Sequence, residues 1–123
     1  MLLFLCYPKC STCKKAQAFL DEKGLRYEVR DIKLNNPDID ELRLWWERSG
    51  LPLKRFFNTS GLQYKALGLK EKLPEMSDEE QLTLLATDGM LVKRPILISD
   101  QFVLVGFRMQ EWEHILATDL ADD

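Results

Sequence analysis

The sequence predicts an α/β fold in which one mixed β-sheet is formed by an N-terminal βαβ unit and a C-terminal ββα unit. Three observations support this prediction. Strand and helix patterns alternate within the first 32 residues, helical patterns dominate the middle of the chain, and two short apolar runs precede a last helical pattern. A chain of 123 residues can bury one hydrophobic core without stabilising disulfide bonds or metal ions, so we expect residues 1–123 to form a single domain.

The first unit is expected to be a strand, a helix and a second strand. Residues 2–6 form a continuous apolar run, which is typical of a strand buried on both faces. A helix is expected over residues 11–23, where apolar residues recur at helical spacing and Gly24 provides the stop. Residues 26–32 alternate between polar and apolar, which indicates a strand. The helical connection makes the two strands parallel.

The middle of the chain is expected to form a helical insert. One helix is predicted to begin at Pro37, behind an asparagine cap, and to end at Gly50. A single helical turn is expected at residues 64–67. The capping-box pattern of Ser77–Glu80 opens a further helix, which Asp88-Gly89 stops.

The end of the chain is expected to form a hairpin and a helix. The apolar runs at residues 95–98 and 102–105 are separated by a short polar turn, which indicates two antiparallel strands. A helix is predicted over residues 110–116, and the tail at residues 118–123 is expected to fray. The order β-α-β, helices, β-β-α is the thioredoxin arrangement.

Charge and hydropathy exclude several classes of function. The net charge of −3 and pI near 5.2 argue against direct nucleic-acid binding but leave a protein partner open. The longest apolar stretch, residues 1–6, is too short to span a bilayer and lacks the features of a signal peptide. We therefore expect a cytoplasmic protein with no membrane partner, in a compartment where a cysteine pair is more often catalytic or metal-binding than structural.

The stretch YPKCSTCKKA places Cys10 just before a predicted helix and Cys13 in its first turn. Unpaired N–H groups and the positive dipole end of a helix stabilise a thiolate there, so Cys10 is the expected nucleophile. Cys13 would resolve the adduct and leave a Cys10–Cys13 disulfide. Lys9 adds positive charge, and the hydroxyls of Ser11 and Thr12 are expected to cap the helix or to bind an oxyanion of the substrate.

The cysteine pair has two other interpretations. A zinc site normally needs four ligands, and beyond the pair only Cys6 and His114 are available, so we predict no metal. Cys6 is expected to be a buried small hydrophobe. The remaining alternative is that the two thiols pack or cap at the helix start and are unreactive.

Arg94 and Pro95 form a second constellation, directly before an apolar strand. Thioredoxin folds carry a cis-proline that faces the redox pair at this point. Arg94 would then point toward the sulfurs and stabilise a thiolate or bind a substrate oxyanion. The alternative is a trans proline that opens an edge strand.

With these residues in hand, the chain resembles the arsenate reductase-like (ArsC/Spx) family, which has a thioredoxin fold, and within it the small uncharacterised members with a CxxC motif. The resemblance implies that Cys10 is the nucleophile and that Arg94 precedes the cis-proline, Pro95. The motifs that carry it are YPKCSTCKKA (residues 7–16), FFNTSG with the later tyrosine (residues 56–64), DGMLVKRPIL (residues 88–97) and VGF (residues 105–107).

The resemblance implies a thiol–disulfide oxidoreductase that acts on a thiol or disulfide substrate. It would hold no bound cofactor, with glutathione or thioredoxin as the reductant. The second cysteine, Cys13, and the absence of arginine at residues 58–60 depart from arsenate reductases and favour a disulfide over arsenate. The alternative is a redox-sensing regulator of the Spx type, which would bind a protein partner such as RNA polymerase without turnover.

Overall fold

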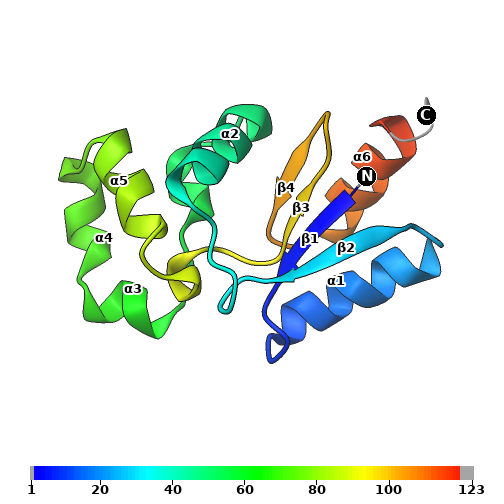
Figure 1. Cartoon of the computed structure of the whole chain (residues 1–123), viewed down its shortest axis with the longest axis horizontal. Coiled ribbons are helices and arrows are strands. Elements are labelled where there is room, and N and C mark those ends of the chain that lie inside the picture. The colour runs from blue at the N-terminus through cyan, green and yellow to red at the C-terminus, as the bar shows by residue number, and fades with distance from the viewer. Residues whose placement is uncertain (1, 120–123) are drawn as a thin grey trace.

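The computed structural model describes residues 2–119 and contains a four-stranded mixed sheet with helices on both faces (Figure 1). The strand order is β2-β1-β3-β4. β1 pairs in parallel with β2 and antiparallel with β3, and β3 pairs antiparallel with β4. The α/β, thioredoxin-like fold expected from the sequence is confirmed. The strands are β1 (Leu2–Cys6), β2 (Tyr27–Asp31), β3 (Ile96–Ile98) and β4 (Val103–Val105).

Six α-helices and three short 3-10 helices accompany the sheet over the described residues. No helix in this part of the chain is long and apolar enough to cross a membrane. The α-helices are α1 (Ser11–Glu22), α2 (Ile39–Ser49), α3 (Leu62–Ala66), α4 (Leu69–Lys72), α5 (Asp78–Leu85) and α6 (Met109–Asp119). The 3-10 helices are η1 (Leu53–Phe56), η2 (Leu73–Glu75) and η3 (Gly89–Leu91).

The strand register gives the sheet two apolar faces. Phe4, Leu97 and Leu104 lie side by side across three strands and pack in one cluster with buried residues of α1 and α6, among them Trp112. Side chains alternate across a strand, so the neighbouring residues of each strand face the other way. The sheet is therefore covered on one face by α1 and α6 (Figure 1).

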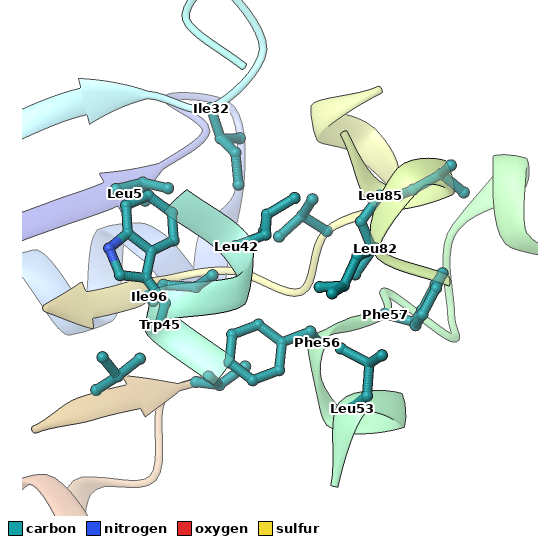
Figure 2. Close-up of a cluster of buried hydrophobic side chains, with 14 of the residues drawn as sticks. Leu5, Ile32, Leu42, Trp45, Leu53, Phe56, Phe57, Leu82, Leu85 and Ile96 are labelled. Carbon is teal, nitrogen blue, oxygen red and sulfur yellow. The ribbon is translucent and has the colours of Figure 1, made fainter. Parts of the chain in front are cut away.

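The opposite face of the sheet joins a second cluster with the helical insert. Leu5 and Ile96 pack there with Trp45 of α2. Figure 2 shows how this cluster continues past α2 to Phe56 and to Leu82 of α5. Burying such side chains is the main favourable term in folding, so the insert and the sheet share one core rather than forming separate units.

The start of α2 differs from the prediction that placed Pro37 at the first helical position behind an asparagine. The N-cap is Asp38, whose carboxylate accepts a hydrogen bond from the Glu41 N–H at 2.8 Å. The Glu41 carboxylate accepts one from the Asp38 N–H at 3.1 Å. This capping box satisfies two helix-end donors at once, whereas the side chain of Asn36 donates to the Ala86 carbonyl oxygen at 2.7 Å.

The other predicted elements differ from the structure only at their ends. The capping box of Ser77–Glu80 opens α5 as expected, and Gly50 ends α2 with a φ of 68°. The last helix is longer than predicted and runs through Asp119, so fraying of the tail is wrong for residues 118 and 119. Residues 120–123 of that predicted tail lie outside the described residues.

Candidate redox site

Cys10 occupies the N-cap of α1, at the end of the turn that follows β1. Its N–H donates to the Tyr7 carbonyl oxygen at 2.9 Å, which closes the turn and sets the helix start directly beyond the buried strand. Because Leu5 pairs with Ile96, the end of β1 and the beginning of β3 lie at the same end of the sheet. The register therefore brings the cysteine turn and the Arg94-Pro95 segment together.

Cys13 lies three residues after Cys10, in the first turn of α1, and its side chain is only 2% exposed. The Tyr7 N–H donates to its Sγ at 3.4 Å. Burial, followed by its hydrogen bond to Cys10 and the negative charge on that sulfur, raises the pKa of Cys13 to about 12 despite the Tyr7 N–H, which lowers it. Cys13 is therefore a protonated thiol at neutral pH.

Cys10 is half-buried, and its environment acts in the opposite direction. Burial alone would raise the pKa of Cys10, but the N–H and thiol of Cys13, the positive charge of Arg94 and the N–H of Thr12 together lower the pKa. No side-chain hydrogen bond caps α1, so the helix-start N–H groups remain available to the Cys10 sulfur. The environment therefore favours the thiolate form of Cys10 and the protonated form of Cys13.

Arg94 supplies the positive charge of the site. Its peptide bond to Pro95 is cis, the geometry expected from the sequence, and Pro95 is buried. The guanidinium carbon lies 5.3 Å from the centroid of the Tyr7 ring, a cation–π contact. The Nε and Nη1 atoms are buried and have no hydrogen-bond partner among residues 2–119. These two donors can serve an anion that arrives beside Cys10.

The structure brings Cys10, Cys13 and Arg94 together, whereas Lys9, Ser11 and Thr12 are exposed. The expectation that Ser11 or Thr12 caps the helix is wrong, because Cys10 occupies the N-cap position. Of the exposed residues, Thr12 lines a cavity beside the helix start.

Cys6 is 5% exposed and packs in the same apolar cluster as Cys13, as expected of a small hydrophobe. Burial, together with the charges of Asp31 and Cys10, raises the pKa of Cys6. His114 is exposed on α6. All three cysteines are free thiols.

Sequence reasoning did not predict that four cations gather in one cavity at the start of α1. The cavity that Thr12 lines has a volume of about 490 Å³, and four of its other lining residues are cationic. They belong to three separate segments, so no local motif could reveal them. The cationic residues are Lys54, Arg55, Lys93 and Arg108.

The two cysteines lie at a helix start, their pKa values are shifted in opposite directions, and a cis-proline lies beside them. These features define a thiol-based redox protein with a thioredoxin-like fold. The ArsC family model matches residues 5–115, and the chain belongs to this family. The resemblance inferred from the motifs is confirmed.

The relatives match more than nine-tenths of the chain. The uncharacterized protein YusI of Bacillus subtilis is 50% identical over 112 residues, which are 91% of this chain and 95% of that protein. The crystal structure of an ArsC family related protein from Bacteroides fragilis matches with a TM-score of 0.90 and 54% identity, covering 93% of this chain and 96% of that one.

More distant relatives have named activities. An arsenate reductase of Neisseria meningitidis is 29% identical over 110 residues, which are 89% of this chain and 92% of that protein. The global transcriptional regulator Spx of Enterococcus faecalis is 27% identical over 120 residues, which are 98% of this chain and 89% of that protein. The family thus includes both an enzyme and a regulator.

Proposed function

We propose that this protein is a thiol–disulfide oxidoreductase in which Cys10 is the nucleophile and Cys13 the resolving thiol. The observation that supports this most strongly is the opposed environment of the two sulfurs. Cys10 is half-buried with a lowered pKa, whereas Cys13 is buried with a pKa raised to about 12. A thiolate is the attacking form, and this difference supports Cys10 as the first sulfur to attack.

The reaction begins when the Cys10 thiolate attacks one sulfur of a disulfide substrate. An S–S bond forms between Cys10 and that sulfur, the substrate S–S bond breaks, and one substrate thiolate leaves. The attack neutralises the Cys10 sulfur and so removes a charge that raises the pKa of Cys13. Cys13 then loses its proton to water and attacks the Cys10 sulfur, which releases the second substrate thiol.

Two electrons have then passed from the protein dithiol to the substrate, and Cys10 and Cys13 share a disulfide. A cellular thiol, glutathione or thioredoxin, restores the dithiol by exchange. The protein itself needs no bound cofactor for this cycle. Regeneration by a cellular thiol needs a reducing compartment, so we assign the reaction to the cytoplasm.

Arg94 is proposed to stabilise the Cys10 thiolate and the departing thiolate. Its charge lowers the pKa of Cys10, and its unpartnered Nε and Nη1 atoms are donors for a negative group. Lys9, Ser11, Thr12 and Pro95 are the proposed substrate contacts around the cysteine turn. Residues 58–60 contain no arginine, so we favour a disulfide over arsenate as the substrate.

A second candidate is a redox-sensing regulator, which the 27% identity to Spx of Enterococcus faecalis favours. In that case the Cys10–Cys13 disulfide would change the surface at the start of α1 and hence the affinity for a protein partner such as RNA polymerase. The chemistry of disulfide formation is shared with the enzyme, but the protein would not turn over.

Turnover separates the two candidates. The reduced protein is mixed with hydroxyethyl disulfide in two coupled assays. One contains glutathione and glutathione reductase, and the other contains thioredoxin and thioredoxin reductase. The consumption of NADPH is followed in both. We expect many turnovers, complete loss in Cys10→Ser, and accumulation of a mixed disulfide in Cys13→Ser. Cys6→Ala is the matched control and should retain turnover. A single oxidation per molecule without turnover in either system would support the regulator.

A further inference from the structure

A cavity of about 490 Å³ lies beside the first turn of α1. This volume falls within the range of roughly 300–1,000 Å³ that is usual for small-molecule sites. Thr12, in the first turn of α1, forms part of its wall, and Phe57 and Phe107 are among its other lining residues. The cavity is therefore large enough for a small organic molecule, and Thr12 places it two residues along the chain from Cys10.

The charge of this cavity is opposite to that of the whole chain. Its lining includes Lys54, Arg55, Lys93 and Arg108 and no acidic residue, although the chain carries a net charge of −3. Within residues 2–119, none of these four side chains forms an ion pair. Cations gathered in a concave site raise the local concentration of anions, so this cavity favours a negatively charged ligand.

The fold, rather than local sequence, gathers these cations. Phe57 and Val92 form a β-bridge, and the Lys93 N–H donates to the Phe56 carbonyl oxygen at 2.8 Å. These contacts hold the segment that carries Lys54 and Arg55 against the segment that leads to the cis-proline.

The end of β4 completes the cavity. Val105 pairs with Ile96, so the residues after β4 lie at the same end of the sheet as the cysteine turn. Gly106 has a φ of +74°, and a Cβ there would lie 3.2 Å from the Lys93 Cε, which shows how closely the lysine stem crosses this glycine.

The cavity is fixed to the helix that carries the cysteines. The ring of Phe107 lies 5.5 Å from that of Phe19 in α1 and 5.0 Å from that of Trp112 in α6, measured between centroids. Lys93 directly precedes Arg94, whose charge acts on Cys10. Packing and chain continuity therefore join the cation-lined wall to the helix that carries Cys10.

We propose that this cavity holds the anionic group of the disulfide that Cys10 attacks, and that the substrate is a low-molecular-weight disulfide carrying at least two negative charges. The inference rests on the proposed function. The Cys10 thiolate displaces one substrate thiolate and forms a mixed disulfide, while the charged group of the retained half binds Lys93 and Arg108. Cys13 then releases that half as a thiol, and a cellular thiol reduces the Cys10–Cys13 disulfide.

A series of disulfides that differ in charge tests the proposal. The probes are dithiodipropionate (two negative charges), hydroxyethyl disulfide (neutral) and cystamine (two positive charges), with kcat/KM measured for each. We expect the dianion to be preferred over the neutral disulfide by about tenfold or more, with cystamine the poorest. The preference should shrink as salt is added, because the cavity is open to solvent.

Variants identify the cavity as the source of the preference. Lys93→Gln combined with Arg108→Gln should bring the ratio of dianion to neutral disulfide close to one. Arg26→Gln combined with Lys70→Gln removes the same net charge at exposed positions outside the cavity and should keep the wild-type ratio. Oxidised glutathione and coenzyme A disulfide then distinguish carboxylate from phosphate as the recognised group.

Alkylation of Cys10 tests the charge preference of the cavity even if the protein does not turn over. Iodoacetate and iodoacetamide modify Cys10 by the same reaction but differ in charge, and the ratio of their rates is compared with that for free cysteine. We expect a ratio several-fold higher in the protein, lowered by the cavity pair of substitutions and not by the control pair. An unchanged ratio would overturn this inference alone, whereas absence of turnover with every disulfide would overturn the proposed function.

Discussion

The guanidinium of Arg94 lies over the ring of Tyr7, with its Cζ 5.3 Å from the ring centroid, and two of its nitrogens are buried without a partner. This contact joins the segment before the cis-proline to the turn that carries Cys10. A buried donor without a partner is costly in an ordinary core, and such groups commonly mark sites that bind something. The arrangement keeps a positive charge directed at the redox pair.

Arg94→Gln should raise the pKa of Cys10, because it removes the positive charge that acts on the sulfur. We expect alkylation of Cys10 by iodoacetamide at pH 7 to slow by about threefold to tenfold. The pH dependence of the alkylation rate gives the pKa directly. Arg26→Gln, at an exposed position before β2, is the control and should leave the profile in place.

The raised pKa of Cys13 predicts a loss of stability in alkali. The native thiol keeps its proton up to about pH 12, whereas the unfolded thiol loses it near its ordinary value of 9.0. Unfolding therefore releases a proton in this window. The stabilisation is fully present below pH 9 and is lost as the pH rises toward 12.

Urea unfolding of the reduced protein at pH 9.5 and pH 10.5 measures this effect. The free energy of unfolding of the wild type should fall by roughly 1 kcal/mol more than that of Cys13→Ala over this interval. The comparison is between changes in the free energy of unfolding with pH. The constant loss of stability caused by the smaller alanine side chain therefore cancels. Equal slopes would show that Cys13 is not held as a thiol.

The capping box at the start of α2 gives a prediction about folding alone. Asp38→Ala removes the side chain that accepts from the Glu41 N–H and should lower the free energy of unfolding by about 0.5–2 kcal/mol. The site lies outside the cysteine turn, so the alkylation rate of Cys10 should not change. A stability equal to that of the wild type would mean that the capping box contributes nothing.

Trp112 links α6 to the wall of the cationic cavity. Its Nε1–H donates to the Gly106 carbonyl oxygen at 3.0 Å in a buried position. Trp112→Phe leaves that carbonyl without its partner and should destabilise the protein by about 1–3 kcal/mol. Thermal unfolding measures the change, and Trp46→Phe, which removes a half-buried hydrogen bond to the Leu51 carbonyl oxygen, should cost less.

Local sequence patterns predicted most of the helices and strands, because interactions between residues close in the sequence determine these elements. The apolar run of β1, the capping box of α5 and the glycine that ends α2 each depend on a few neighbouring residues. The start of α1 at Ser11 was predicted, but the start of α2 was not. Pro37 suits a first helical position, but the backbone places the cap at Asp38, and local propensity does not decide between adjacent positions.

Part of the candidate site could also be predicted from the sequence, and part could not. Cys10 and Cys13 are one helical turn apart, and the order of elements placed Arg94-Pro95 opposite them, so both groups were accessible to sequence reasoning. Lys54, Lys93 and Arg108 converge only through the β-bridge to the insert and the register of β4. Their grouping is a property of tertiary structure, which no single segment encodes.

The most direct test of the account is the site of the mixed disulfide. Cys13→Ser is reacted with a small disulfide and mapped by peptide mass spectrometry, and the wild type is mapped in parallel. We expect a stable adduct on Cys10 in the variant and a Cys10–Cys13 disulfide, two mass units lighter than the dithiol, in the wild type. An adduct on Cys6, or no adduct on Cys10, would contradict the assigned order of attack.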